Sequence, residues 1–458
     1  MPQFGTSGLR GLSTDLTDAL CASYAAAFVS QHKHNGRLFV GQDRRDSSPR
    51  IAAAVARGAA GQGLDIVDCG VLPTPALAGA ALAEGTLSIM VTGSHIPADR
   101  NGLKFYTSLG EFTKSDEAPL ADAIKDWTLE EAAPNYVPFD AASAYVARFT
   151  DGIASNALAG RKVGMWVHSS AASEVLPTIL CRLGAEVVEL LPSDNFIPVD
   201  TEAVDEEMRL QLAELVASHG LDAIVSTDGD ADRPLMIDDQ GRVMPGDILG
   251  PITANWVGAS EVVTTVSANT MVDALGSFAQ VARTKIGSPY VIAAMEERMA
   301  AGVGSVAGYE PNGGFLLGWD ATGTATLPKL MTRDSTLPLV ATLAQTTADG
   351  VSLSAMLERL PIRRTATDRL QDVPREKSLA LVDDILAGDM SMMPDMLGSL
   401  SGTDTTDGVR LTFDTARVVH IRPSGNAPEL RCYVEAESSE AASEVLVSVL
   451  DSLRKRVT

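Results

Sequence analysis

The chain has 458 residues, 45% of them hydrophobic and 21% charged, which is typical of globular proteins and unlike disordered chains. At about 150 residues per domain, this length predicts two to four domains. Thirty-six Lys and Arg residues against 59 Asp and Glu residues give a formal net charge of −23, which disfavours binding to nucleic acid or to an anionic membrane. A small anionic ligand would need a local cluster of Arg and Lys side chains.

The four cysteines, Cys21, Cys69, Cys181 and Cys432, lie far apart and form no C-x-x-C pair. This spacing disfavours a disulfide scaffold or a zinc ribbon and is typical of reduced thiols in the cytosol. The first residues lack the basic and apolar regions of a signal peptide, and no apolar run approaches the ~20 residues of a membrane span. We therefore expect a soluble cytoplasmic protein.

Short apolar runs alternate with helix-like stretches in three successive rounds. In the first round, strands are predicted at 37–40, 64–71 and 87–91, and helices at 49–62 and 75–83. In the second, strands are predicted at 162–167, 186–191 and 223–226, and helices at 171–183 and 206–218. In the third, strands are predicted at 261–266, 283–286 and 305–307, and helices at 272–281 and 290–301. This alternation predicts parallel strands covered by helices.

The pattern changes in the last part of the chain. Strands are predicted at 409–413, 417–421 and 430–436 with no helix between them, and helices at 379–386 and 441–453. Successive strands without intervening helices predict an antiparallel α+β domain. The expected fold class is therefore α/β, with three related α/β domains and a C-terminal α+β domain. The predicted domains are 1–143, 144–246, 247–362 and 363–458.

A polar loop follows the last strand of each α/β round, at the edge where open α/β sheets bind ligands. The first loop, residues 92–104, contains Ser94 beside His95, and also contains Lys104. A serine in this setting can be a nucleophile or a phosphoryl carrier, although Thr-Gly-Ser-His-Ile is not the G-x-S-x-G elbow of hydrolases. A polar turn after a strand is the alternative that this loop alone leaves open.

The second loop, residues 228–233, places Asp228, Asp230 and Asp232 at alternating positions. If the loop curls, the three carboxylates converge on one point, and such oxygen ligands suit Mg²⁺, Mn²⁺ or Ca²⁺. The EF-hand pattern does not fit, because Arg233 stands where glycine is required and Asp239 stands where glutamate is required. The loop favours a metal site in an α/β fold over a solvated acidic turn.

Two further loops offer groups that suit a phosphorylated sugar. In residues 308–314, the oxygens of Glu310 and Asn312 can hydrogen-bond adjacent sugar hydroxyls, with a glycine-rich turn as the alternative. Residues 422–431 offer a guanidinium, a hydroxyl and backbone N–H groups to a phosphate, with a plain hairpin turn as the alternative. Cations in or beside glycine-containing loops favour a small phosphorylated ligand; they are Arg10, Lys104, Arg233, Lys285 and Arg422.

Together these loops, in this order and spacing, resemble the α-D-phosphohexomutase family, which includes phosphomannomutases and phosphoglucomutases. The resemblance runs from residue 4 to about residue 435. It implies four domains round a central cleft, three related α/β domains with mixed sheets and a final α+β domain. It also implies a phosphoryl transfer that interconverts a hexose 1-phosphate and its 6-phosphate through a phosphoserine and a 1,6-bisphosphate.

The resemblance implies roles for the residues of each loop. Ser94 matches the serine that carries the phosphoryl group, and one of its phosphoryl oxygens would complete a Mg²⁺ site. The implied protein ligands of Mg²⁺ are Asp228, Asp230 and Asp232. Arg10 matches the arginine that steadies the transferring phosphate, whereas Lys104 and His95 match residues that assist proton transfer.

The substrate contacts are implied in the same way. Glu310 matches the glutamate that binds the 3- and 4-hydroxyls of the sugar, and the loop after residue 421 matches the one that grips the non-reacting phosphate. The other implied substrate-binding residues are Arg233, Lys285, Asn312, Arg422, Ser424, Gly425, Asn426 and Arg431. A hexose 1,6-bisphosphate is expected as activator, and a monomer or a homodimer as the assembly.

Three departures from the family pattern bear on the sugar and leave the reaction type unchanged. Ile96 stands where most members have Asn, the sugar loop reads Glu-Pro-Asn-Gly-Gly, and Asn426 stands where Thr is commoner. The catalytic loop is similar to that of bacterial phosphomannomutases, which favours mannose phosphate. Glucose phosphate, or both sugars, is the alternative, and a glucosamine phosphate is less favoured. A non-catalytic phosphosugar-binding protein is the alternative of another class, disfavoured by the intact serine and aspartates.

Overall fold

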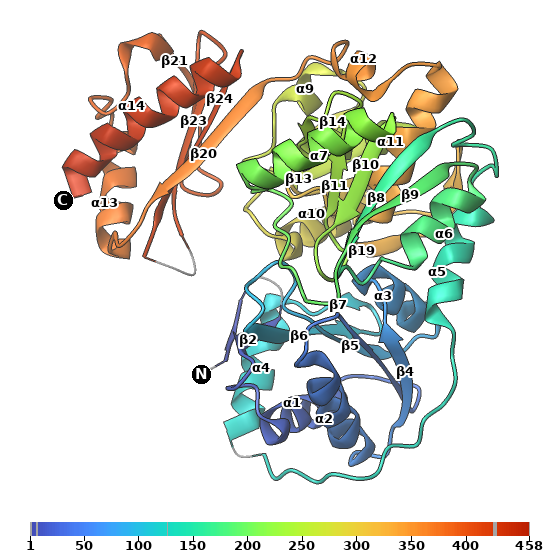
Figure 1. The fold of residues 1–458 in the computed structure, drawn as a ribbon. Helices are drawn as coiled ribbons and strands as arrows, with labels where there is room; N and C mark the ends of the chain where they lie inside the picture. Colours follow the sequence, from blue (N-terminus) through green and yellow to red (C-terminus); the bar gives the residue numbers. More distant parts are fainter. Residues whose placement is uncertain (1, 6–7, 126, 425–427, 458) are drawn as a thin grey trace.

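The computed structural model of the protein describes residues 2–5, 8–125, 127–424 and 428–457. Within these ranges the chain forms four domains in sequence order, each built round one main β-sheet (Figure 1). The second and third domains pack side by side on the first, and the fourth, which ends the chain, stands to one side. No helix in the described ranges is both long and apolar enough to cross a membrane.

The first domain contains a mixed sheet with helices on it. Its elements are β1 (Gln3–Phe4), β2 (Leu9–Leu12), α1 (Asp18–Gln31), β3 (Arg37–Gln42), α2 (Ser48–Ala60), β4 (Asp65–Val71), α3 (Thr74–Ala83), β5 (Leu87–Val91), β6 (Arg100–Thr107), β7 (Gly110–Glu111) and α4 (Lys114–Lys125). The strand order is β1-β2-β6-β5-β3-β4, with β7 paired to β6. Alternate residues of β5 enter two cores, because Ile89 and Val91 pack with α1 and α2 whereas Met90 packs with α3.

The second domain repeats this design with five strands. Its elements are α5 (Ala141–Thr150), β8 (Lys162–His168), α6 (Val175–Arg182), β9 (Glu186–Pro192), α7 (Glu206–His219), β10 (Ala223–Thr227), β11 (Pro234–Ile237) and β12 (Val243–Met244). The strand order is β12-β11-β10-β8-β9. Local signals set the ends of α7, since the Asp205 side chain accepts a hydrogen bond from the Met208 N–H and Gly220 closes the helix at φ 60°.

The third domain has the sheet order β14-β13-β15-β16-β19. Its elements are α8 (Gly246–Trp256), β13 (Glu261–Thr265), α9 (Met271–Ala274), β14 (Gln280–Thr284), α10 (Ser288–Ala300), β15 (Val306–Tyr309), β16 (Phe315–Leu317), β17 (Ala321–Thr322), β18 (Thr326–Leu327), β19 (Leu330–Asp334), α11 (Thr336–Asp349) and α12 (Leu353–Leu357). The strands β17 and β18 form a separate two-stranded sheet.

The fourth domain is antiparallel and has a core of its own. Its elements are β20 (Arg364–Leu370), α13 (Arg375–Leu386), a 3₁₀ helix η1 (Asp395–Leu397), β21 (Leu400–Asp404), β22 (Val409–Phe413), β23 (Val418–Pro423), β24 (Leu430–Ala436) and α14 (Ser439–Val457). The sheet order is β20-β24-β23-β22-β21. This arrangement confirms the predicted fold class of three α/β domains with mixed sheets plus an α+β domain.

The structure corrects the bounds of two predicted elements in the third domain. The helix expected at 272–281 is the four-residue α9, and the strand expected at 283–286 is β14, which begins three residues earlier. The strand pairs in parallel along all of β13, from Gln280 opposite Glu261 to Thr284 opposite Thr265. This long-range pairing, together with a turn at Gly276 (φ 64°), outweighs the helical propensity of the local sequence.

Candidate active site

Each α/β domain presents its site loop in the same way. The loop leaves a parallel strand and returns along an antiparallel neighbour: β5 to β6, β10 to β11, and β15 to β16. The loops therefore begin at the carboxyl ends of the inner strands, where an open sheet leaves room for a ligand. The expected first loop is shorter than predicted, because residues 100–104 already belong to β6 and Lys104 therefore projects from a strand.

Ser94 lies at the centre of the arrangement and is 1% exposed. Its Oγ donates to Oδ2 of Asp228 at 2.5 Å and lies 3.2 Å from Nδ1 of His95. Its backbone adopts φ 54°, a left-handed conformation that non-glycine residues seldom adopt outside constrained sites. The hydroxyl is thus held against the carboxylate of another domain.

Arg45, which sequence reasoning missed, holds the Ser94 loop in shape. Its guanidinium donates to four backbone carbonyls, those of Ser94 (2.9 Å), Ile96 (2.6 Å), Pro97 (2.6 Å) and Arg100 (2.9 Å). Asp43 pairs with Arg45 at 3.1 Å, and both side chains are fully buried. These hydrogen bonds to one guanidinium hold the loop in shape, although the segment between β5 and β6 contains no helix or strand.

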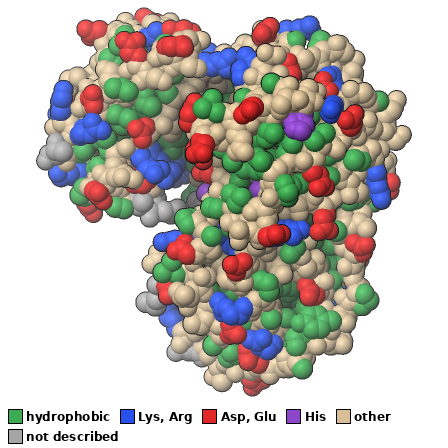
Figure 2. Space-filling model, in the orientation of Figure 1, with side chains coloured by type: hydrophobic (Ala, Val, Ile, Leu, Met, Phe, Trp, Pro, Cys, Tyr) green, Lys and Arg blue, Asp and Glu red, His purple; other side chains and the backbone are tan. Residues whose placement is uncertain are grey.

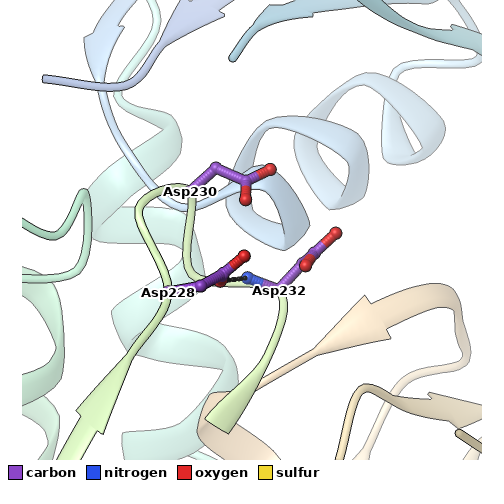
Figure 3. Close-up of side chains that lie close together, drawn as sticks. All are labelled: Asp228, Asp230 and Asp232. Carbon is purple, nitrogen blue, oxygen red and sulfur yellow. Dashed lines mark hydrogen bonds between the residues drawn. The ribbon is translucent and has the colours of Figure 1, made fainter. Parts of the chain in front are cut away.

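The three aspartates come from the loop between β10 and β11, and their side chains point to the same side (Figure 3). One oxygen from each lies within 4.8 Å of the others, and all three residues are buried. Asp228 also shapes the loop, because its Oδ1 accepts from the N–H groups of Asp232 and Arg233 at 3.2 Å. Thr74 of the first domain donates to Oδ2 of Asp230 at 2.6 Å.

Two cations neutralise this cluster. Nζ of Lys104 lies 2.5 Å from Oδ2 of Asp230 and 2.6 Å from Oδ2 of Asp232, and Nη2 of Arg333 lies 2.7 Å from that same oxygen of Asp232. Burial and the neighbouring aspartates raise the pKa of Asp228 well above its ordinary value. Burial acts in the same direction on Asp232, but Arg333, Lys104 and other cations outweigh it and lower the pKa of Asp232.

The aspartate cluster fits a divalent cation. Oδ1 of Asp230 and Oδ1 of Asp232 are buried, and neither accepts a hydrogen bond from a described residue. Such oxygens are costly to bury unless a donor or a cation meets them. The donor set consists only of carboxylate oxygens, the ligands that Mg²⁺ prefers. These three residues could therefore hold a metal ion.

Three more predicted residues, Arg10, His95 and Arg233, interact with the aspartate cluster. Arg10 lies on β2 opposite Gly102 of β6, rather than in a loop as expected, and burial with Arg233 nearby lowers its pKa to about 10. Burial, followed by Arg233 and Arg10, lowers the pKa of His95 to about 2, so its ring is neutral. Arg233 itself lies 3.9 Å from Oδ1 of Asp232 and 3.6 Å from Glu202.

Glu310 and Asn312 lie in the loop between β15 and β16, as predicted, and are 4% and 7% exposed. Oε1 of Glu310 is 3.2 Å from Nη1 of Arg333, the side chain that also reaches Asp232. Oδ1 of Asn312 accepts from the N–H of Gly314 at 2.9 Å and closes its own loop. Arg333 thereby connects the sugar loop with the aspartate cluster.

A cleft of about 610 Å³ separates the second and third domains from the fourth. Glu202, Glu310, Asn312 and Arg431 are among its lining residues. Figure 2 shows the molecule hollowed beside the fourth domain, with basic side chains near the hollow. The cleft has the size of a small-ligand site and carries groups from three domains.

The predicted phosphate loop lies in the hairpin between β23 and β24. Arg422 pairs with Asp407 at 3.5 Å, Arg431 pairs with Glu429 at 3.2 Å, and the backbone of Ser424 donates to the Glu429 carbonyl. The predicted contacts Gly425 and Asn426 lie outside the described residues. Lys285 is exposed, but the next residue along donates its N–H to Asp407 at 3.2 Å, which brings this segment to the fourth domain.

Sequence reasoning missed Arg45, Arg333 and Glu202. Arg333 follows an apolar segment in β19, Arg45 stands in a short charged stretch after β3, and Glu202 resembles a solvated acidic residue. None has a local motif, because most of their partners come from distant segments; the pairing of Arg45 with Asp43 is the local exception. Arg45 carries one usable signal, since Asp43, Arg44 and Arg45 follow a strand at the edge where site loops gather.

Known proteins match this arrangement along the whole chain. Models of phosphoglucomutase/phosphomannomutase alpha/beta/alpha domains I, II and III match residues 1–131, 143–241 and 245–363, and the model of the C-terminal domain matches 370–452. A phosphomannomutase of Sinorhizobium fredii is 43% identical, with 98% of each chain covered. One of Salmonella muenchen is 40% identical, with 99% of this chain and 96% of the relative covered.

Solved structures show the same fold. A phosphoglucomutase/phosphomannomutase family protein of Burkholderia thailandensis superposes with a TM-score of 0.78 at 22% identity, over 98% of this chain and 96% of its own. Four domains in one order, one serine loop facing one aspartate loop, and family models in all four domains point to the same relationship. The chain therefore belongs to the phosphoglucomutase/phosphomannomutase family.

Proposed function

We propose that the protein is a phosphomannomutase that reversibly interconverts mannose 1-phosphate and mannose 6-phosphate. The observation that carries the proposal is the 2.5 Å contact between Oγ of Ser94 and Oδ2 of Asp228, which joins a candidate phosphoryl carrier to a candidate metal ligand. The names of the two relatives at 40–43% identity support mannose as the sugar. The enzyme would be an intramolecular phosphotransferase of the isomerase class.

The reaction would proceed in two transfers. The 6-hydroxyl of the hexose 1-phosphate attacks the phosphorus of phospho-Ser94, its proton goes to a nearby base, and the bond from phosphorus to Oγ breaks. The resulting 1,6-bisphosphate turns over in the cleft. The phosphoryl group at C1 then returns to Ser94 and leaves the hexose 6-phosphate, so no phosphate is gained or lost. A hexose 1,6-bisphosphate would restore any enzyme that has lost its phosphoryl group.

The chain's own residues would neutralise charge and move the proton. Asp228, Asp230 and Asp232, with an oxygen of phospho-Ser94, would hold Mg²⁺, and the bound ion would neutralise charge that develops on the phosphoryl oxygens. Arg10 would steady the transferring group. Burial, followed by Arg233 and Arg10, lowers the pKa of His95, and a phosphate dianion that offsets the charge of the two arginines would return part of its basicity. Lys104 would supply or accept the proton at the opposite transfer.

The remaining predicted residues would hold the sugar phosphate at both ends. Glu310 would accept from the 3- and 4-hydroxyls, with Asn312 beside it. The non-reacting phosphate would meet a group of cations and donors from the third and fourth domains. These are Arg233, Lys285, Arg422, Ser424, Gly425, Asn426 and Arg431. A grip that recognises only a phosphate and two hydroxyls suits an intermediate that must bind in two orientations.

A phosphoglucomutase, or an enzyme that takes both sugars, is the second candidate function. Mannose and glucose differ only at C2, whereas Glu310 is assigned to the 3- and 4-hydroxyls, which the two sugars share. A non-catalytic phosphosugar-binding protein is disfavoured, because such a protein would not need a buried serine hydroxyl directed at a carboxylate cluster. We also propose domains of about 1–143, 144–246, 247–362 and 363–458, with α5 kept whole in the second and α8 whole in the third, and a monomer or a homodimer as the assembly.

The test is ³¹P NMR of the purified protein with Mg²⁺ and a catalytic amount of hexose 1,6-bisphosphate. Mannose 1-phosphate and glucose 1-phosphate are supplied in parallel. We expect conversion of mannose 1-phosphate to the 6-phosphate, at a rate that equals or exceeds that for glucose. Faster conversion of glucose 1-phosphate would make the protein a phosphoglucomutase, and conversion of neither sugar would refute the proposed activity.

A further inference from the structure

Arg333 occupies a position between two functional loops. It projects from β19, is 4% exposed, and reaches Oδ2 of Asp232 at 2.7 Å with one terminal nitrogen and Oε1 of Glu310 at 3.2 Å with the other. Asp232 belongs to the loop between β10 and β11 of the second domain, whereas Glu310 belongs to the third domain. One planar guanidinium therefore fixes the relative positions of two buried carboxylates from two domains.

The segment beside Arg333 leaves space for its side chain. A Cβ on Gly314 would lie 2.7 Å from Cδ of Arg333 and 2.9 Å from its Cγ, so a larger residue there would displace it. Gly314 ends the loop that carries Glu310, directly before β16, which pairs with β19. The glycine thus leaves the space through which Arg333 passes under the sugar loop.

The residues next to Arg333 anchor its strand to the first and second domains. Thr332 donates to Oε1 of Glu111 in the first domain at 2.7 Å. The hydroxyl of Tyr145 in the second domain donates to Asp334 at 2.6 Å. The hydroxyl of Ser335 donates at 2.7 Å to the carbonyl of Ala231, next to Asp232 in the aspartate loop. Arg333 is therefore held by its backbone neighbours as well as by its own ion pairs.

We propose that Arg333 is a positioning residue that couples the sugar loop, residues 308–314, to the aspartate loop, residues 228–233. The inference rests on the proposed function, in which Glu310 binds sugar hydroxyls and Asp232 binds the metal ion. By holding Oε1 of Glu310, Arg333 fixes the carboxylate and leaves Oε2 to accept from the sugar. By facing Oδ2 of Asp232, the same guanidinium competes with a divalent cation for that carboxylate.

This double role predicts opposite effects on the two ligands. Loss of the Arg333 charge removes a competitor of the metal ion, so the metal should bind more tightly. Loss of the ion pair with Glu310 leaves that carboxylate mobile, so the sugar phosphate should bind more weakly. A merely structural ion pair would weaken both ligands together with the fold, and this difference in sign separates the two roles.

The experiment compares Arg333→Met and Arg333→Lys with the wild-type enzyme. Mn²⁺ affinity is measured by titration under electron paramagnetic resonance, and KM and kcat are measured with mannose 1-phosphate and glucose 1-phosphate. For Arg333→Met we expect Mn²⁺ to bind about threefold or more tightly and KM to rise about tenfold, with a smaller change in kcat. For Arg333→Lys we expect Mn²⁺ affinity within about twofold of wild type and a raised KM, because an ammonium lacks the guanidinium fork.

Two controls keep the result specific. Arg298→Met removes another Arg–Glu pair of the third domain, in which Nε and Nη2 of Arg298 donate to Glu261 at 2.7 and 2.8 Å. This variant should leave the binding of Mn²⁺ and of the sugar phosphate unaffected. In a Glu310→Gln background, Arg333→Met should raise KM little further, because the two changes act through one contact.

The proposal is overturned if Arg333→Met changes KM and Mn²⁺ affinity no more than Arg298→Met does, or if Mn²⁺ binding weakens. If Arg333→Met does not fold, an unchanged KM in Arg333→Lys overturns it alone. Failure of the proposed function is a separate result, because wild-type enzyme would then convert neither sugar phosphate while its Mn²⁺ titration would still report on the pair of Arg333 with Asp232.

Discussion

Arg45 illustrates how a single residue can set the shape of a loop, here the one that carries Ser94. Its guanidinium meets four carbonyls of residues 94–100, while Asp43 supplies the counter-charge and also accepts from the Thr92 hydroxyl at 2.7 Å. No neutral side chain could satisfy four converging carbonyls at once. The position of the Ser94 hydroxyl therefore depends on a residue that lies outside the loop.

Replacement of Arg45 by Met should inactivate the enzyme. The change leaves Asp43 as a buried charge without its partner and releases four carbonyls, a loss on the order of 3 kcal/mol of folding free energy, with turnover reduced at least 100-fold. Chemical denaturation and the mutase assay measure the two effects. Arg44→Met is the matched control, because Arg44 is an exposed neighbour that pairs only at the surface with Glu174. Equal activity in the two variants would contradict the assigned role.

Ser94→Ala should abolish turnover and keep sugar-phosphate binding. The change removes the hydroxyl proposed to carry the phosphoryl group, yet it leaves the proposed substrate contacts in place. Mutase activity and calorimetric binding of mannose 1-phosphate measure the two properties. Ser88→Ala is a suitable control, because Ser88 is a buried serine of β5 whose Oγ has no hydrogen-bond partner among the described residues. An active Ser94→Ala enzyme would exclude the phosphoserine mechanism.

At the scale of elements, the sequence predicted what local patterns encode. The aspartate loop was predictable, because three acids at alternating positions followed by a short apolar strand form a local signal. Arg10 and Lys104 were expected in loops but lie on β2 and β6, two strands that pair antiparallel across most of the first domain's sequence. Arg333 had no local signal at all, because Asp232 and Glu310 come from other segments. Long-range pairing, rather than propensity, decided these positions.

Asp247, in the first turn of α8, should make the stability of the protein depend on pH. Burial, with Glu435 and Glu202 nearby, raises the pKa of Asp247 to about 7, although the N–H of Asn269 donates to it at 3.0 Å. An unfolded Asp titrates near pH ~3.9. Between about pH 4 and pH 7 the folded state therefore binds a proton that the unfolded state lacks. The contribution of Asp247 to the free energy of unfolding consequently falls as the pH rises.

Asp247→Asn should remove that pH dependence, because the amide cannot ionise and its oxygen can still accept from Asn269. We expect the variant to gain on the order of 4 kcal/mol at about pH 8.5 and nothing at about pH 4, because the two pKa values differ by about three units. Urea denaturation of both proteins at the two pH values measures the difference. A gain that is the same at both values would show that ionisation of Asp247 is not its cause.

At the scale of the whole molecule, the fourth domain is the part least bound to the rest. One hydrophobic core runs through the first three domains, whereas the fourth has a separate core. Polar contacts join it to the third domain: the Thr270 N–H donates to Glu435 at 3.1 Å, and the Asn269 side chain donates to the Arg363 carbonyl at 2.7 Å. From such an interface we expect the fourth domain to move as a unit when a phosphate enters the cleft.

Asp407 lies at this interface, where the proposed phosphate would meet Arg422. Its Oδ2 accepts from the Ile286 N–H of the third domain at 3.2 Å and lies 3.5 Å from Nη1 of Arg422, the arginine assigned to the distal phosphate. The carboxylate therefore occupies an anion position between two domains. Any phosphate that binds Arg422 competes with it for the same positive charge.

Asp407→Asn should consequently strengthen phosphate binding. The amide oxygen can still accept from Ile286, but the competing negative charge is gone, so inorganic phosphate should inhibit turnover about three- to tenfold more strongly. The inhibition constant of phosphate against mannose 1-phosphate measures this effect. Asp414→Asn is the control, because Asp414 accepts from the Ser399 N–H in the same domain and has no contact with Arg422. Equal inhibition of the two variants would show that Asp407 does not hold Arg422 in solution. Movement of the fourth domain would then not depend on the replacement of Asp407 by phosphate at Arg422.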